Sequence, residues 1–338
     1  MADEAMAEPS HTRKKRLSVI ARPDDPGGMD LESTVQDWRA DGFVILPGFI
    51  PAEELTAAVS ELGLLFPSAE GFHDGTDSRR GRFIGDEFAG IDTFPFASTE
   101  ISLLAVRPRL LALAQALLGD SDVHIYAAEA WAKYTGACDY DQDLHRDYLN
   151  HTVLVPSTTP GCSQVEMFVF LTDVPEELGP PHLLSRRHTA HIPAVPNWFL
   201  RPGQDSAWRF NDDSGSPQMY GAEVSGAGPA GTVIAFEVGT FHRGTQLTAP
   251  RGARYSMHLG FRPSSLSWGQ RVGWAARSFE REWVAFVHRA TPRQLQVFGF
   301  PPPGHPYWTP QTLAGMALRY PELDLTPWSA SVPATRRP

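Results

Sequence analysis

Three residues could together bind a metal ion: His145, Asp147 and, far downstream, His242. If His145 and Asp147 lie on one strand, their i, i+2 spacing points both side chains to the same side of the sheet. A histidine from a distant strand would then complete a set of two imidazoles and one carboxylate. Such a set leaves coordination positions of a non-haem iron open for a co-substrate and oxygen. Because a His-x-Asp pair is common by chance, the surrounding segments must support this interpretation.

The segments near His242 predict the strands that such a site needs. Residues 231–236 read as a turn glycine followed by a buried strand, and His242 falls on the segment just after it. A second strand, 254–261, begins with Arg254 and has Ser256 two residues later on the same face. The planar fork of an arginine suits a carboxylate, and a serine hydroxyl can add one more donor. An anionic co-substrate could therefore be held at its far end while its near end chelates the metal.

At these residues the chain resembles the phytanoyl-CoA dioxygenase family of Fe(II)/2-oxoglutarate-dependent oxygenases. The likeness extends to an opening strand and helix at 41–55, a central strand at 168–174 and a return segment at 177–188. It runs from about residue 35 to about residue 262, with all parts in order.

Two segments depart from the family pattern. The turn that usually reads Asn-Gly-Pro-Leu is Leu-Gly-Pro-Pro at 178–181, and the strand that usually ends Pro-Gly-Ser-His is Leu-Ser-Arg-Arg-His at 184–188. In the family these positions border the mouth of the active site. The change therefore bears on the substrate more than on iron.

The resemblance implies that Fe(II) is held by the catalytic residues His145, Asp147 and His242. It also implies that 2-oxoglutarate, the co-substrate, binds Arg254, with Ser256 beside it. Arg251 is an alternative partner for its carboxylate; Arg254 is preferred because it opens the strand. In such enzymes O2 oxidises a C–H bond of a small molecule while 2-oxoglutarate becomes succinate and carbon dioxide. Related halogenases lack the carboxylate ligand, so Asp147 favours hydroxylation.

Composition indicates one large enzyme domain in 338 residues, because 42% of them are hydrophobic. A formal net charge of -10 argues against nucleic acid or an anionic membrane as a partner. The two cysteines, Cys138 and Cys162, lack paired metal spacing and indicate a reduced, cytoplasmic protein. We expect no membrane span, because no apolar run approaches membrane-spanning length, and no secretory signal, because no long apolar stretch follows the basic run at 13–16.

The order of patterns predicts a mainly β fold with flanking helices, built on a double-stranded β-helix core of the jelly-roll or cupin kind. Helical patterns occur near 33–38, from Pro51 to Leu62 and over 108–118, before strands that begin near Val123. We expect a disordered tail (1–30), the dioxygenase domain with its helical N-terminal part (31–263), and a helical C-terminal extension rich in proline and aromatic residues (264–338).

Three features of the second half need separate interpretation. Residues 193–230 form a long polar insertion that we expect to be a lid or a mobile loop. Residues 226–231 spell Gly-x-Gly-x-x-Gly, but a strand follows and a proline lies inside, so we predict a loop and no nucleotide site. In the extension we expect a helix over 272–288 and then an aromatic, proline-rich arm at 299–308, which could cover the barrel or join two subunits.

Other polar residues near the ligands are ambiguous. His151 could face the substrate or support the metal site, or could be structural; His188 and His191 favour a polar surface role. Residues that flank the metal motif could line the pocket or be structural: Lys133, Gln142 and Tyr148.

Three alternatives remain open. A keto-acid-independent, cupin-type enzyme would use similar ligands without Arg254, and a non-catalytic binding protein could keep the fold. A specialist for coenzyme A thioesters would need a basic groove, and the acidic composition favours a small free metabolite instead. The oligomeric state is open, with a dimer as one possibility.

Overall fold

The computed structural model describes most of the chain, namely residues 30–137, 141–147, 151, 161–192, 198–199, 216–269, 273–278 and 280–330. The tail predicted for residues 1–30 lies outside this part except for Asp30, and so do Cys138 and Tyr148.

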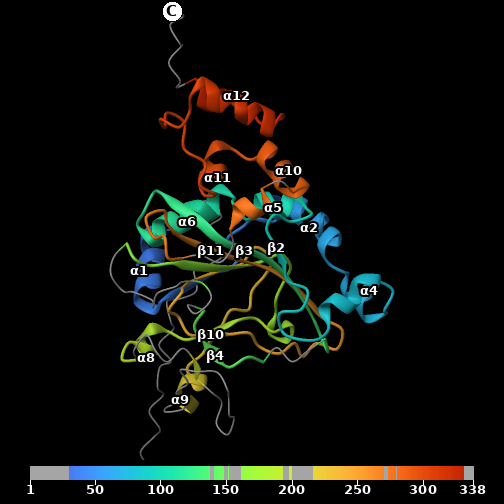
Figure 1. The fold of residues 1–338 in the computed structure, drawn as a ribbon. Coiled ribbons are helices and arrows are strands. Elements are labelled where there is room, and N and C mark those ends of the chain that lie inside the picture. Colours follow the sequence, from blue (N-terminus) through green and yellow to red (C-terminus); the bar gives the residue numbers. More distant parts are fainter. Residues whose placement is uncertain are drawn as a thin grey trace, which may run out of the picture.

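Two antiparallel sheets form the centre of the described part (Figure 1). The larger sheet has the order β1 (Phe43–Leu46), β9 (Val233–Glu237), β5 (Val165–Phe170), β11 (Ala253–Pro263), β3 (Val123–Tyr134) and β2 (Asp92–Thr93). The smaller sheet has the order β7 (Trp198–Phe199), β4 (Leu144–His145), β10 (His242–Arg243), β6 (His182–Leu183) and β8 (Val224–Ser225).

Side chains of the larger sheet alternate between two environments, as the period of a strand requires. On β11, Met257 and Leu259 belong to the main hydrophobic core, which includes the helices. The alternate residues Arg254, Ser256 and His258 therefore point to the other face, toward the smaller sheet. A second, smaller apolar cluster between the sheets joins residues of both, including Phe236 of β9 and Leu183 of β6. The space between the sheets thus holds both apolar and polar side chains.

The helices before β3 cover the larger sheet. They are α1 (Leu31–Asp41), α2 (Ala52–Ser60), α3 (Leu62–Leu65), α4 (Ala69–His73), η1 (Ser78–Phe83), α5 (Thr99–Leu104) and α6 (Pro108–Leu118). The prediction for α6 is confirmed, because proline occupies its first turn and Gly119 ends it with a left-handed φ of 66°. Pro51 does not lie inside a helix as predicted; it is the N-cap of α2, and the apolar stripe continues into α3.

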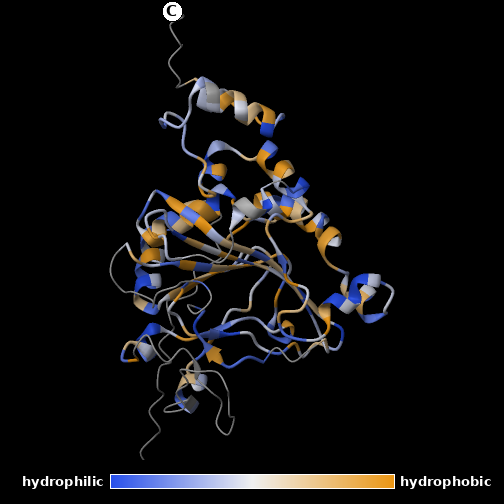
Figure 2. Cartoon of the chain, in the orientation of Figure 1, coloured by the Kyte–Doolittle hydropathy of each residue, from blue (hydrophilic) through white to orange (hydrophobic). Residues whose placement is uncertain are grey.

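Strands do not dominate the chain, so the prediction of a mainly β fold is not confirmed. The two sheets with flanking helices are present, but several strands have only two residues, and more of the described residues lie in helices than in strands. Figure 2 shows why helices form here: α6 is hydrophobic over much of its length. Its leucines are buried against the sheet, and burial of an apolar stripe is the main source of helix stability in proteins.

One stretch, Thr99–Leu118, is long and apolar enough for a membrane span by length and composition. The expectation that no run reaches that length is therefore wrong. The stretch consists of α5 and α6, with a break between them, and 61% of its apolar window is buried inside the protein. Its apolar residues, including Ile101 and Leu110, are core residues.

The long insertion is partly regular. Within it lie β7, α9 (Ser216–Gly221) and β8, and β8 pairs with β6 in the smaller sheet. The expectation of a lid or a mobile loop falls mostly on residues 193–197 and 200–215, which lie outside the described part of the chain, so it stays a prediction. The glycine motif at 226–231 lies between β8 and β9 and opens no helix, as predicted. Shorter helices in this half are η2 (Glu176–Leu178) and α8 (Arg186–Thr189).

The C-terminal extension is helical, as predicted, but more broken. Its elements are η3 (Trp274–Arg277), α10 (Arg281–Arg289), α11 (Pro292–Gln296), α12 (Pro310–Arg319) and α13 (Thr326–Ser329). The predicted helix over 272–288 is thus divided, and α10 occupies only its second half. Phe286 of α10 packs edge-on against Phe94, with ring centroids 4.9 Å apart. Trp308 of the aromatic arm lies against Trp328 of α13, at 5.3 Å between centroids.

Candidate metal centre

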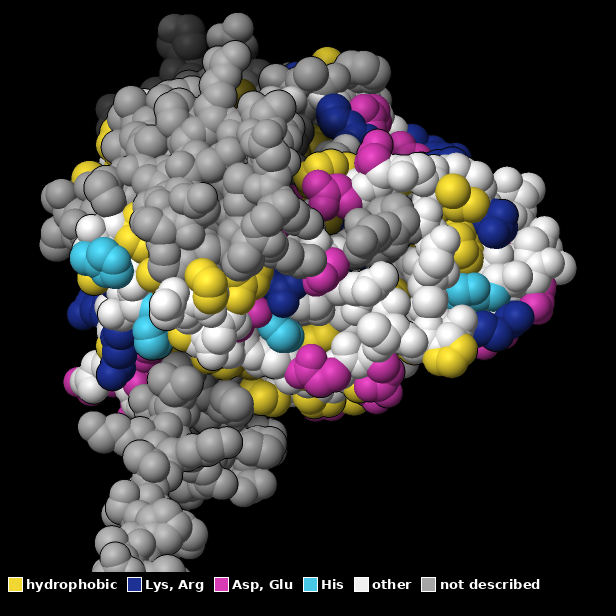
Figure 3. Space-filling view, turned by 90° about the horizontal axis from the view of Figure 1, so that it is seen from below, with side chains coloured by type: hydrophobic (Ala, Val, Ile, Leu, Met, Phe, Trp, Pro, Cys, Tyr) yellow, Lys and Arg dark blue, Asp and Glu magenta, His cyan; other side chains and the backbone are white. Residues whose placement is uncertain are grey.

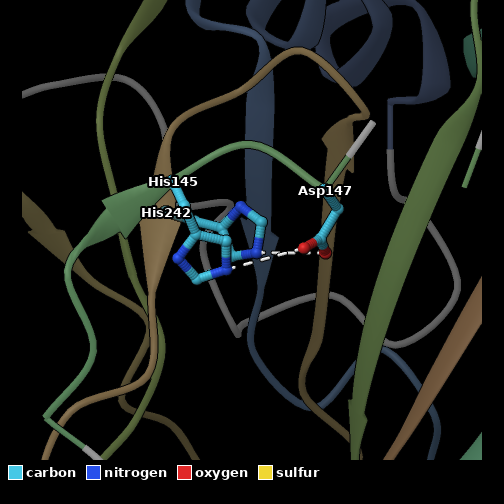
Figure 4. Close-up of side chains that lie close together, drawn as sticks. All are labelled: His145, Asp147 and His242. Carbon is cyan, nitrogen blue, oxygen red and sulfur yellow. Dashed lines mark ion pairs between the residues drawn. The ribbon is translucent and has the colours of Figure 1, made fainter. Parts of the chain in front are cut away.

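Two imidazoles and one carboxylate converge between the sheets. The Nε2 atom of His145 lies 3.5 Å from Oδ1 of Asp147, and the Nε2 atom of His242 lies 3.3 Å from Oδ2 of the same carboxylate. One ligand atom from each residue lies within 4.8 Å of the others. Figure 4 shows both imidazoles facing the Asp147 carboxylate. The three residues singled out from the sequence are therefore brought together.

The backbone explains how residues so far apart in sequence meet. His145 of β4 and His242 of β10 are direct partners across an antiparallel pair, and their ring centroids lie 4.7 Å apart. Asp147 is not on the same strand as His145, contrary to the expectation, because β4 ends at His145. It lies in the turn just beyond the strand. The convergence thus depends on the turn after β4 as well as on the sheet.

Both histidines are oriented by the backbone before them. The Nδ1 atom of His145 lies 2.7 Å from the carbonyl oxygen of Asp143, and that of His242 lies 3.1 Å from the carbonyl oxygen of Thr240. A carbonyl oxygen can only accept, so each Nδ1 carries the proton and donates it. In the neutral ring the lone pair is then on Nε2, the atom that faces Asp147. This is the tautomer that a metal ligand needs.

Electrostatics keeps the carboxylate charged. Burial alone would raise the pKa of Asp147, but without a metal ion the charge of His242 and the hydrogen bonds that the imidazoles donate when protonated at Nε2 hold that pKa well below its usual range. Burial opposes protonation of His145, yet its hydrogen bond to Asp147 raises the pKa of that imidazole. For His242 burial dominates, and its pKa is lowered. A buried anionic carboxylate between two imidazoles is an arrangement that a divalent cation stabilises.

The geometry fits a first-row transition metal. Ligand atoms about 2.1 Å from a metal and at right angles to one another lie about 3 Å apart. The two nitrogen–oxygen distances, 3.5 Å to Oδ1 and 3.3 Å to Oδ2 of Asp147, are close to this value, and with one atom from each residue the three ligand atoms lie within 4.8 Å of one another.

The two candidate arginines differ sharply. Arg254 is only 7% exposed and lies on β11 with its side chain toward the smaller sheet, and Ser256, at 6%, lies on the same face. Arg251 lies outside the strand, its side chain is 56% exposed, and it forms an ion pair of 2.5 Å with Asp74. Only Arg254 is thus placed on the face where the triad lies.

The residues that flank the motif have distinct surroundings. Lys133 of β3 is directly opposite Arg254 in the strand register and is buried, with its ammonium 4.8 Å from the centre of the Trp131 ring. The side chain of Gln142 bridges Glu87 and the backbone amide of Gly244. Lys133 therefore belongs to the interior wall, and Gln142 joins the segment before β4 to the segment after β10.

His151 is fully buried and contacts Glu166, whereas His188 and His191 are exposed, as a surface role predicts.

The sequence analysis missed a group of buried polar residues beside the triad. Glu166 of β5 is fully buried and contacts His151 and His258, and Tyr126 donates a short hydrogen bond to it. A charged residue two positions before Phe168 on a strand of otherwise apolar residues was the available signal. Its partners come from other strands, so their convergence could not be read from one segment.

Comparison with known proteins agrees with the geometry. The family model described as phytanoyl-CoA dioxygenase matches residues 38–254. No curated protein sequence matches the chain. The solved structure of the epimerase SnoN in complex with Fe3+, alpha-ketoglutarate and nogalamycin RO is 21% identical. It covers 70% of this chain and 84% of SnoN with a TM-score of 0.50, which indicates a shared fold. HygX from Streptomyces hygroscopicus, with nickel and 2-oxoglutarate bound, is 18% identical, covers 68% of this chain and 86% of HygX, and has a TM-score of 0.46.

Proposed function

Because the chain belongs to the phytanoyl-CoA dioxygenase family, we propose that it binds Fe(II) through His145, Asp147 and His242 and hydroxylates a small molecule. Members of this family are oxygenases that depend on Fe(II) and 2-oxoglutarate, so these two are the cofactor and co-substrate of this enzyme. The observation that supports the ligand assignment most strongly is the pair of Nε2 atoms that face one buried carboxylate. We further propose that the two sheets form a jelly-roll core.

Arg254 would bind the distal carboxylate of 2-oxoglutarate, with the hydroxyl of Ser256 beside it. A buried guanidinium on the face of the triad can pair with a carboxylate in a fork-to-fork geometry, and low exposure strengthens that pairing. Arg251 is a poor candidate, because it is exposed and already pairs with Asp74. The position of Arg254 also argues against an enzyme that uses no keto acid, since such an enzyme would not require this arginine.

Bound iron and 2-oxoglutarate supply the oxidising power to break an unactivated C–H bond with O2. In the overall reaction the substrate gains one oxygen atom as a hydroxyl group, and 2-oxoglutarate takes the other and becomes succinate and carbon dioxide. The residues of the chain hold and orient the reactants: the carbonyls of Asp143 and Thr240 fix the two imidazoles. If Asp147 binds the iron as proposed, it would fill the ligand position that related halogenases leave for a halide, so hydroxylation is the proposed outcome.

A small free metabolite is the proposed substrate class. On the face seen from below, basic side chains are scattered among acidic and hydrophobic ones, and the described part of this face has no large basic patch (Figure 3). The phosphates of a coenzyme A thioester or of nucleic acid would favour such a patch.

Other properties remain proposals. We propose a cytoplasmic location, because the sequence has only two cysteines, and Cys162, in the described part, forms no disulfide. The division into a tail, a domain over 31–263 and an extension over 264–338 also stays a prediction, as does a dimer.

The assignment of Arg254 can be tested with a matched pair of variants. In the metal-loaded protein, Arg254→Ala should weaken 2-oxoglutarate binding at least about tenfold, because a buried charged partner is lost. Arg251→Ala should change it by less than about twofold, because exposed ion pairs contribute little. Calorimetric titration of each variant with 2-oxoglutarate measures the difference. Equal affinities for the two variants would remove Arg254 from the co-substrate site.

A further inference from the structure

A buried carboxylate links three strands to the segment that follows the metal motif. Glu166, in β5, is 0% exposed. Its Oε1 atom lies 2.7 Å from Nδ1 of His151 and accepts a hydrogen bond from the hydroxyl of Tyr126, on β3. Its Oε2 atom lies 3.1 Å from Nε2 of His258, on β11. We call these four residues the Glu166 cluster.

The cluster lies beside the triad but does not belong to it. The His258 ring stacks on Phe168, with centroids 4.7 Å apart, and the centroid of Phe168 is 6.1 Å from that of His242. One phenyl ring therefore separates the cluster from a candidate metal ligand. The reaction proposed above assigns no role to Glu166.

His151 differs from the other members because it lies four residues after Asp147 in the sequence. It is held to β5 at two points. Its imidazole contacts Glu166, and its carbonyl oxygen accepts a hydrogen bond of 3.3 Å from Nε2 of Gln164, the residue just before β5. His151 is thus attached to the larger sheet by both its side chain and its backbone.

Such an attachment matters for Asp147 because the strand does not fix that residue. β4 ends at His145, so no ladder hydrogen bond of the smaller sheet holds the backbone at Asp147. The carboxylate contacts the two imidazoles, and these contacts are replaced when a metal ion binds. Among the described residues, the chain is fastened before Asp147 by β4 and by Arg146, whose guanidinium lies 4.1 Å from the centre of the Phe241 ring, and after it by His151.

We propose that Glu166 and Gln164 are positioning residues for the metal site: they fasten His151 to β5 and so hold the Asp147 carboxylate where the two imidazoles can share a cation with it. The inference rests on the proposed function. It assigns Glu166 no contact with metal, co-substrate or substrate.

The first test uses Glu166→Gln, which keeps the shape of the side chain and removes its charge. Because Glu166 acts on Asp147 only through His151, metal affinity should fall about tenfold, the lower end of the effect of losing a group hydrogen-bonded to a ligand, while 2-oxoglutarate affinity at saturating metal should change by less than about threefold. Mn(II) is a suitable probe because it accepts carboxylate and imidazole ligands and its free ion is counted by electron paramagnetic resonance. A general loss of structure would weaken the binding of both metal and 2-oxoglutarate. A loss of metal affinity with little change in 2-oxoglutarate affinity therefore supports the positioning role.

A matched pair of variants distinguishes the attachment of His151 to β5 from a general effect of the charge around Glu166. His151→Phe and His258→Phe each remove one imidazole from Glu166, but only His151 lies close to Asp147 in the sequence. We expect His151→Phe to weaken Mn(II) binding about tenfold or more, and His258→Phe to weaken it by less than about threefold. Circular dichroism and thermal unfolding establish that each variant is folded. If Glu166→Gln does not fold, Gln164→Ala, which removes only the bond to the His151 carbonyl, should still weaken Mn(II) binding several-fold.

Equal effects of His151→Phe and His258→Phe, or unchanged Mn(II) affinity in folded Glu166→Gln, would overturn the inference. In those cases a wild-type protein that binds Mn(II) and 2-oxoglutarate leaves the proposed function intact. A wild-type protein that binds no Mn(II) would contradict the proposed function itself.

Discussion

At the scale of single residues, the orientation of the two imidazoles decides whether their Nε2 atoms can bind a metal ion. A backbone carbonyl two residues earlier fixes each ring, so His145 and His242, on neighbouring strands, are oriented in the same way. Their types and the spacing to Asp147 could be read from the sequence. The carbonyls could not, because every residue has one and only the fold decides which imidazole it meets.

The Glu166 carboxyl should make the stability of the protein depend on pH in the acid range. Burial alone would raise its pKa, but the charge of His151 and hydrogen bonds to both histidines hold the pKa at about 2, below its ordinary 4.5. A lowered pKa in the folded state contributes stability that is present above pH 4.5 and is lost as the pH falls toward about 2. Between these values the free energy of unfolding of the wild type should therefore fall more steeply than that of Glu166→Gln. Urea titrations across this range measure both slopes, and equal slopes would contradict a charged, paired Glu166.

At the scale of elements, the long and strongly patterned segments could be predicted, and the short ones could not. The prediction for α6 is confirmed from Pro108 to Leu118, since a proline start, an apolar stripe and a glycine end act locally. The strand β8 has two residues and forms through pairing with β6, far away in sequence. Local propensity carries little information about such a strand. For the same reason the sequence did not predict that β4 ends at His145, two residues before Asp147.

The turn that leads into β9 should be sensitive to a single methyl group. Gly231 has a φ of +80°, and a Cβ built there would collide with the backbone carbonyl oxygen of Ile50. Gly136 also has a positive φ, +72°, but a Cβ there would meet nothing within 4 Å. Gly136→Ala should cost about 1–2 kcal/mol for the left-handed backbone alone. Gly231→Ala should cost about 1–3 kcal/mol more because of overpacking.

Chemical denaturation of the two glycine variants measures these costs. If both variants lost the same stability, the close approach of β9 and the segment before α2 would not be part of the fold.

At the scale of the whole molecule, the C-terminal extension shares the main core. The aromatic composition of this region was evident from the sequence, but its partners were not. Phe286 of α10 is fully buried in the same apolar cluster as the helices before β3, with its ring against Phe94. Figure 1 shows α10 beside α5 and α2, on the side of the sheet away from the smaller one. A pattern in one sequence shows that a segment is apolar, and tertiary packing decides what it covers.

This packing predicts a contrast between two positions of the extension. Phe286→Ala should destabilise the protein by about 3–5 kcal/mol, because it leaves a cavity in the core. Leu318→Ala on α12 should change stability by less than about 0.5 kcal/mol, since Leu318 is 84% exposed. Thermal unfolding of the two variants checks the contrast. Equal, small effects would mean that the extension folds apart from the domain.

The most direct test of the central claim is an anaerobic titration of the full chain with Fe(II) and then 2-oxoglutarate, followed in the visible range. We expect a weak charge-transfer band that forms only when both are present, and that is lost, or requires far more iron, in Asp147→Ala. A wild-type protein that binds iron but forms no band with 2-oxoglutarate would contradict the assignment of this site to 2-oxoglutarate-dependent chemistry.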